Sequence, residues 1–117
     1  MDQGKRRHIR WKKKIRVAYA LMQESESYQE VFTEDISESG LQIISFDRLT
    51  PKQAVRLRLE FVYDSVPIVA MAKVVYVGEF ENKFRIGLEF LKMDSFQEQR
   101  LKRYLGKLRQ DFGDEID

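Results

Sequence analysis

Apolar and polar residues alternate along most of the chain after residue 14, which is the period of strands with one buried face. The clearest case is residues 55–61, where Val55, Leu57, Leu59 and Phe61 are expected to face a core while the residues between them face water. Further segments with strand character are residues 15–22, 28–36, 41–46, 68–77 and 83–90. The pattern therefore predicts six strands.

Turn-forming residues separate these segments. Residues 23–27 are polar, residues 35–40 read Asp-Ile-Ser-Glu-Ser-Gly, and Thr50-Pro51 interrupts the chain. Residues 64–67 and 79–82 supply two further connections. Short strands separated by turns every 8–12 residues are typical of antiparallel barrels and sandwiches.

The period changes after Asp94-Ser95, which is a suitable helix N-cap, and Gly113 is a suitable stop. Between them, apolar residues recur at the spacing of one helix face: Leu101, Tyr104, Leu105, Leu108 and Phe112. We expect an amphipathic helix that covers one end or side of the sheet. The alternative is that this face binds a partner.

Charge is unevenly distributed along the sequence. Residues 1–16 hold eight Lys and Arg and one Asp, a net charge of +7, which leaves −5 on the other 101 residues of a chain whose total is +2. Such a basic segment is either a solvated tail or an arm that meets an anion: a nucleotide, nucleic acid, acidic lipid or acidic protein. Because it continues into the first strand without a Gly, Pro or Ser linker, we favour the arm.

Composition excludes several classes of protein. The length of 117 residues, with 43% hydrophobic and 34% charged residues, fits one globular domain. Without cysteine there is no disulfide or cysteine zinc site, and a single histidine, His8, leaves no triad in a suitable context and no multi-histidine metal site. We expect no enzyme, no metal and no cofactor. No signal peptide or membrane span is apparent, so a cytoplasmic location is expected.

Two motifs remain once the core positions are set aside. Arg6-Arg-His-Ile-Arg10 is an R-x-x-x-R directly before the first strand, and residues 35–40 form a D-x-S-x-x-G between the second and third strands. In this order, followed by the strand series and the helix, they resemble the PilZ domain, a family of bacterial receptors for cyclic di-GMP. The resemblance covers residues 5–108. It implies an all-β fold with a C-terminal helix, namely a six-stranded antiparallel β-barrel with a flexible basic N-terminal arm.

The resemblance assigns the ligand to the basic arm. Cyclic di-GMP carries two phosphodiesters and two guanines, and arginine can bind phosphate in two places, bind the guanine edge or stack on it. Arg6 and Arg10 are expected to clamp phosphate and guanine. Lys5 matches the position before the first motif arginine and is expected to add a contact.

The second motif is expected to complete the site on the outer surface of the barrel. Asp35 would accept hydrogen bonds from guanine N–H groups, and Ser37 would offer a hydroxyl to phosphate or base. Gly40 would permit positive φ and leave room for the ligand. Tyr76 and Arg85 are candidates to border the site from neighbouring strands.

The expected organisation is an arm over residues 1–14, the barrel and helix over residues 15–112, and a tail over residues 113–117. Trp11 is interpreted as a core anchor where the arm joins the barrel, the alternative being a surface exposed or hidden on binding. The lysines of residues 12–14 exceed what the resemblance requires and could meet a second anion.

The function expected is a cyclic di-GMP receptor that passes the signal to an unidentified protein partner and controls motility, exopolysaccharide or biofilm formation. One alternative is a PilZ-like interaction module for pilus or flagellar assembly that ignores the nucleotide. Another is a small barrel that binds nucleic acid through the arm, which is disfavoured because most aromatic residues occupy core positions.

Overall fold

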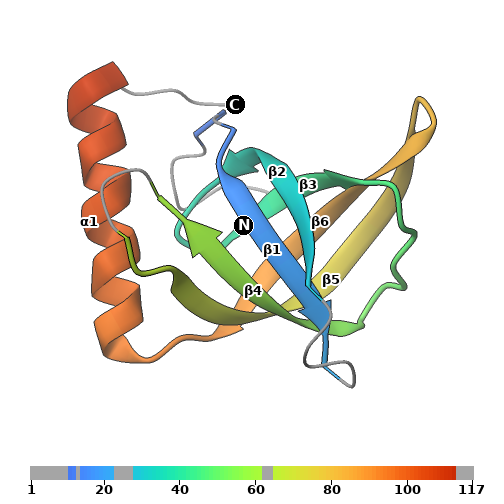
Figure 1. Ribbon diagram of the computed structural model, residues 1–117, viewed down its shortest axis with the longest axis horizontal. Coiled ribbons are helices and arrows are strands. Elements are labelled where there is room, and N and C mark those ends of the chain that lie inside the picture. The colour runs from blue at the N-terminus through green and yellow to red at the C-terminus, as the bar shows by residue number, and fades with distance from the viewer. Residues whose placement is uncertain (1–10, 13, 23–27, 62–64, 113–117) are drawn as a thin grey trace, which may run out of the picture.

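The structure, a computed structural model, describes residues 11–12, 14–22, 28–61 and 65–112. Six strands precede one helix in the chain (Figure 1). The elements are β1 (Arg16–Leu21), β2 (Gln29–Ile36), β3 (Gly40–Ser45), β4 (Ala54–Glu60), β5 (Ile68–Phe80), β6 (Lys83–Lys92) and α1 (Ser95–Phe112).

The strands form a closed barrel in the order β1-β2-β3-β6-β5-β4, and every neighbouring pair is antiparallel. The barrel closes where β1 pairs with β4, so that Arg16 lies opposite Glu60 and Leu21 opposite Val55. Closure satisfies the backbone groups that an open sheet would leave at its edges. The expected six-stranded antiparallel barrel with a C-terminal helix is confirmed.

Alternation in β4 sets the core as the sequence predicts. Val55, Leu57 and Leu59 are fully buried, and Phe61 follows them into the core. Strand β1 departs from the prediction, because Ala18 and Ala20 are buried as well as Val17 and Tyr19. Their small side chains lie between long cross-strand neighbours, Ala18 opposite Arg58 and Ala20 opposite Arg56.

Strands β5 and β6 run past their predicted ends, to Phe80 and Lys92. The turn expected at residues 79–82 is shorter, because β5 runs to Phe80, which pairs with Lys83 of β6. The connection is the two-residue turn Glu81-Asn82, with Glu81 at φ 57°. Tight hairpins of this kind require positive φ, and here the pairing with β6 holds a non-glycine residue in that conformation.

The helix α1 packs along one side of the barrel, as Figure 1 shows. The side-chain carboxylate of Asp94 accepts a hydrogen bond of 2.9 Å from the Gln97 backbone N–H, which confirms the predicted N-cap. Leu101, Tyr104, Leu105 and Leu108 are buried, and the Tyr104 ring stacks on Phe61 with centroids 3.7 Å apart. Phe112, the last member of the predicted face, lies outside the described side chains.

The buried Arg100 fastens the start of α1 to the connection before β5. Its guanidinium donates to the carbonyl oxygens of Val66 and Pro67 and to the Gln97 side chain. Among the described residues, no helix has the length and apolarity that crossing a lipid bilayer requires.

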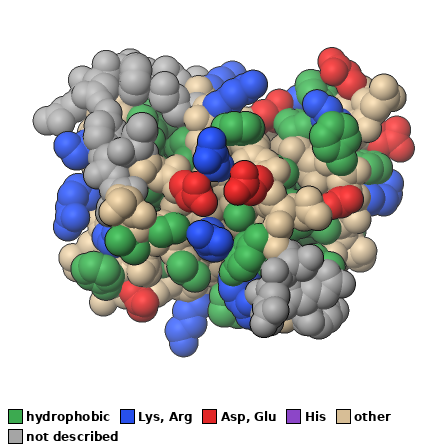
Figure 2. Space-filling view, viewed as in Figure 1, with side chains coloured by type: hydrophobic (Ala, Val, Ile, Leu, Met, Phe, Trp, Pro, Cys, Tyr) green, Lys and Arg blue, Asp and Glu red, His purple; other side chains and the backbone are tan. Residues whose placement is uncertain are grey.

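The face of the barrel formed by β1 and β4 is polar and mixed in charge. Figure 2 shows Lys, Arg, Asp and Glu side chains interspersed over these strands. Arg16 and Arg58 each approach Glu60 at 4.0 Å. Ion pairs this exposed contribute little to stability. We therefore assign no special role to the charges on this face.

Candidate ligand site at the β2–β3 turn

The D-x-S-x-x-G motif forms the tight connection from β2 to β3. Asp35 is the penultimate residue of β2, and Gly40 begins β3. The Ser37 backbone N–H donates to the Gly40 carbonyl oxygen at 2.8 Å, and the Ser37 hydroxyl accepts from the Ser39 backbone N–H at 3.2 Å. Ser37 is 2% exposed, so in this structure its hydroxyl braces the turn.

The motif glycine is required for close approach of two strands. A Cβ on Gly40 would collide with the backbone carbonyl oxygen of Leu88 on β6, with which β3 pairs. Gly40 was expected to permit positive φ and to leave room for the ligand; its φ angle does not lie in the left-handed region, so the turn makes no use of the first property. What the position needs is the absence of a side chain.

The segment before β1 is joined to this motif by backbone hydrogen bonds. Trp11 forms an antiparallel bridge with Ile36, the residue between Asp35 and Ser37, through N–H to O=C bonds of 2.8 and 3.0 Å. Further along, Ile15 and Thr33 exchange hydrogen bonds of 3.0 Å. The chain that follows R-x-x-x-R is therefore held against the chain that carries D-x-S-x-x-G.

Trp11 is 4% exposed and belongs to the hydrophobic core, which agrees with its interpretation as an anchor. It directly follows Arg10 in the sequence. The predicted ligand residues Lys5, Arg6 and Arg10 lie outside the described residues. The structure thus brings together Asp35, Ser37 and Gly40, and it places the attachment point of the arm beside them.

A shallow hollow of about 180 Å³ opens on the outer surface next to the motif. Two small residues form part of its lining, Gly40 on β3 and Gly87 on β6. A Cβ on Gly87 would collide with the Tyr76 ring, so the ring packs directly against the strand at that point. The remaining residues that line the hollow are Ser39, Leu41, Gln42, Val75, Leu88 and Glu89.

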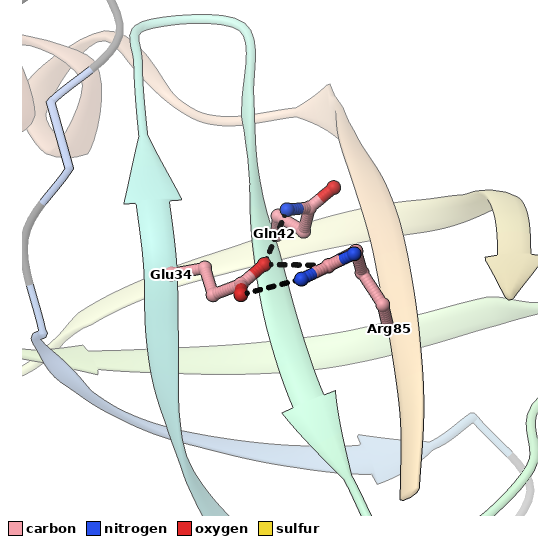
Figure 3. Close-up of polar contacts among 3 residues, drawn as sticks. All are labelled: Glu34, Gln42 and Arg85. Carbon is pink, nitrogen blue, oxygen red and sulfur yellow. Dashed lines mark hydrogen bonds and ion pairs between the residues drawn. The ribbon is translucent and has the colours of Figure 1, made fainter. Parts of the chain in front are cut away.

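A polar cluster crosses three strands beside the hollow (Figure 3). Glu34 of β2 accepts two hydrogen bonds from the Arg85 guanidinium of β6, at 2.8 and 3.0 Å, and one from the Gln42 amide of β3, at 2.5 Å. Hydrogen bonding from Arg85 lowers the pKa of Glu34 below its ordinary value. The guanidinium also lies over the Phe80 ring, 4.2 Å from its centroid.

Asp35 is a buried acid close to this cluster. It is 8% exposed, and its charge contributes to raising the pKa of Arg85, for which the hydrogen bonds to Glu34 are the main cause. A buried carboxylate is an unfavourable arrangement without compensating donors or charges. The site therefore combines the nearly buried carboxylate of Asp35 with the nearby cation of Arg85.

Sequence reasoning anticipated only part of this surface. Tyr76 does line the hollow that contains Gly40, whereas Arg85 is engaged with Glu34 next to it. Glu34, Gln42 and Gly87 were not anticipated. A glycine within a strand often marks the close approach of another group, so the sequence alone could have indicated Gly87. Glu34 and Gln42 look like ordinary outward-facing strand residues.

Over the described part of the chain, no group of three His, Cys, Asp or Glu side chains is placed to hold a metal ion. A second hollow of about 350 Å³ lies between the β2–β3 turn, the end of β6 and the start of α1. Its lining includes the carboxylates of Glu38, Glu89 and Glu98. Lys92 and Lys102 also line this second hollow, so its charge is mixed. The first hollow differs from it in being lined by Gly40 of the motif.

Comparison with known proteins identifies the fold. The model of the PilZ domain family matches residues 4–107. No curated protein sequence matches the chain. The PilZ domain of Escherichia coli YcgR with c-di-GMP superimposes with a TM-score of 0.71 at 14% identity, covering 92% of this chain and 93% of that one.

Two larger proteins contain a similar domain. Bacillus subtilis MotI/DgrA, an inhibitor of motility, gives a TM-score of 0.76 at 18% identity over 92% of this chain. MrkH of K. pneumonia in complex with c-di-GMP gives a TM-score of 0.71 at 15% identity, also over 92% of this chain. The chain spans about half the length of these two proteins, 53% of each.

Proposed function

Because this chain belongs to the PilZ domain family, we propose that it is a non-enzymatic receptor that binds cyclic di-GMP at the β2–β3 turn. The observation that carries the proposal is the bridge between Trp11 and Ile36. This bridge ties the residue after R-x-x-x-R to the middle of D-x-S-x-x-G. It supports the proposal that the two motifs, separated by 24 residues in the sequence, act on one ligand.

The phosphates and guanines of the ligand match the two motifs: the basic R-x-x-x-R segment and the β2–β3 turn. In the proposed complex, Arg6 and Arg10 bind the phosphates and the exposed guanine edges, and Lys5 adds a further cation. Asp35 accepts hydrogen bonds from the N–H groups of a guanine. The surface at Gly40 and Gly87, bare of side chains, lets the flat rings approach the strands, and the exposed Tyr76 ring borders them.

The Ser37 hydroxyl, proposed to contact a phosphate or a base of the ligand, also makes contacts within the turn. It is 3.1 Å from the Ser39 hydroxyl and 3.2 Å from the Ser39 backbone nitrogen. It therefore shapes the turn from which Asp35 and Gly40 project. Contact of the same hydroxyl with the ligand would require it to exchange one of these partners.

The proposed output is a change of surface. Binding holds residues 1–10 across the barrel, and the cost in conformational entropy is offset by the phosphate and guanine contacts. The covered barrel then presents a different face to a protein partner in the control of motility, exopolysaccharide or biofilm formation. The location proposed for this protein is the cytoplasm.

The test is calorimetric titration of cyclic di-GMP into the wild-type protein, Arg10→Ala and Asp35→Asn at near-physiological salt. Arg103→Ala, on an exposed position of α1, is the matched control. We expect micromolar or tighter binding by the wild type and the control, and loss of at least about tenfold in affinity for each motif variant. GTP should give no heat.

Two results would oppose the proposal. Absence of heat and of thermal stabilisation at millimolar cyclic di-GMP would favour an interaction module that ignores the nucleotide. Equal affinity for cyclic di-GMP, GTP and single-stranded DNA, falling steeply with salt, would instead indicate a polyanion-binding arm.

A further inference from the structure

Strands β5 and β6 carry an apolar strip on the outside of the barrel. Val69, Met71 and Val75 of β5 are 47%, 38% and 45% exposed, and Leu91 of β6 is 50% exposed. A register irregularity between Met71 and Ala72 inserts Leu91 opposite this part of β5. We call these four residues the apolar strip.

Cations border the apolar strip on both sides. On the β4 side, Arg56 lies opposite Met71 and Arg58 lies opposite Val69. On the β6 side, Lys92 lies opposite Met71. Within β5 itself, Lys73 lies between Met71 and Val75. Residues 17–117 as a whole carry a net charge of −5. The outer face of β4, β5 and β6 is thus basic on an otherwise acidic body.

The acids near the strip do not neutralise this rim. Glu60 approaches Arg58 at 4.0 Å and Glu89 approaches Lys73 at 3.9 Å, in pairs whose side chains are between 31% and 55% exposed. Pairs that are long and solvated contribute little. Arg56 and Lys92 form no ion pair with the residues that the structure describes, so two cations of the rim are available to a partner.

We propose that the apolar strip is the docking surface for an acidic amphipathic helix of a protein partner. Addition of a strand is disfavoured because the barrel is closed and has no free edge. From Val69 to Val75 the strip spans about 20 Å, the length of about 13 helical residues. Apolar anchors at i, i+3/i+4 and i+7 would lie on the strip, and flanking carboxylates would meet the arginines and lysines.

The position of Glu89 links this surface to the nucleotide site. Glu89 contributes to the hollow that contains Gly40 and forms the ion pair with Lys73 at the apolar strip. Val75 belongs both to the apolar strip and to the lining of that hollow, so a ligand in the hollow would adjoin one end of the docking surface. The docking itself is independent of the proposed nucleotide binding and is tested without cyclic di-GMP.

The experiment selects peptides from a phage-displayed library of random 14-residue sequences against the full chain. We expect the enriched peptides to carry more Asp and Glu than Lys and Arg, with apolar residues at helical spacing. Measured by fluorescence anisotropy, their affinity should fall about tenfold in Met71→Asp and in Arg56→Glu. Phe46→Asp, which alters another exposed apolar residue (77% exposed), is the matched control and should bind normally.

Each remaining outcome overturns the inference. In the peptide experiment, these are enriched peptides without an acidic amphipathic pattern, or peptides that bind Met71→Asp as well as they bind the wild type. Binding of the wild type but not of Met71→Asp to phosphatidylglycerol vesicles would indicate a lipid surface instead. A dimer that Met71→Asp dissociates would indicate a second copy of the chain. Calorimetry with cyclic di-GMP separates the two proposals, because all three variants should retain wild-type affinity for the nucleotide if the receptor proposal holds.

Discussion

At the scale of single residues, the glycines of the barrel differ in what lies next to them. Gly40 faces a backbone carbonyl oxygen, Gly87 faces the Tyr76 ring, and Gly78 has open space around its Cα. The consequence of adding a methyl group differs accordingly, because a ring can turn aside and a paired backbone cannot.

Replacing Gly40 by alanine should therefore destabilise the protein through a clash with the Leu88 carbonyl group. We expect a loss of about 2 kcal/mol or more in the free energy of unfolding, measured by urea denaturation. Gly78→Ala is the control and should be neutral or slightly stabilising. A neutral Gly40→Ala would show that β3 and β6 are not packed as closely as described.

The Glu34–Arg85 pair should make the stability of the folded protein depend on pH. Because the folded-state pKa of Glu34 is lowered from 4.5, the pair stabilises the protein above that pH and is lost as the pH falls through the folded value. Both side chains are about a third exposed, 31% and 37%, so the contribution should stay below about 1 kcal/mol.

Denaturation of the wild type and Glu34→Gln at pH 7 and pH 3 measures this difference. The wild type should be the more stable at pH 7, and the gap should be smaller at pH 3. Glu30→Gln, at an exposed position of the same strand, should follow the wild type at both pH values. A gap of the same size at both pH values would contradict the assignment.

At the scale of elements, the period of the sequence predicted every strand and the helix, because each buries one side of a regular repeat. It failed at the end of β5, where pairing with β6 continues through Glu79 and Phe80. Residues of the site that depend on barrel closure were equally out of reach: nothing local places Gln42 of β3 against Glu34, or Gly87 against Tyr76. The motif residues Asp35, Ser37 and Gly40 were accessible because a single turn holds them.

The N-cap of α1 gives a prediction at this scale. Asp94→Ala removes the acceptor of the Gln97 N–H and should lower the free energy of unfolding by about 1 kcal/mol. Asp94→Asn keeps an oxygen at that place and should cost far less. Thermal denaturation of the two variants checks this, and equal losses would mean that the cap is not the Asp94 side chain.

At the scale of the whole molecule, Trp11 connects the core of the barrel to the segment proposed to hold the ligand. It is the single tryptophan of the chain, and it is buried beside Ile36. Its fluorescence therefore reports on the junction between arm and barrel without any engineered probe.

We expect Trp11 to emit at the short wavelength of a buried indole and to change in intensity when cyclic di-GMP binds. Trp11→Ala should cost about 3 kcal/mol of stability and weaken ligand binding, while Trp11→Phe should retain most of both. An emission spectrum typical of an exposed indole would contradict the packing of this junction.

The central claim is that cyclic di-GMP occupies the outer surface at the β2–β3 turn. Titration of the nucleotide into ¹⁵N-labelled protein, followed by amide chemical shifts, tests it most directly. The account predicts the largest shifts at Gly40, Gln42 and Gly87, with α1 little affected. Shifts concentrated on Glu98, Leu101 and Lys102 beside the larger hollow, or no shifts at saturating ligand, would contradict it.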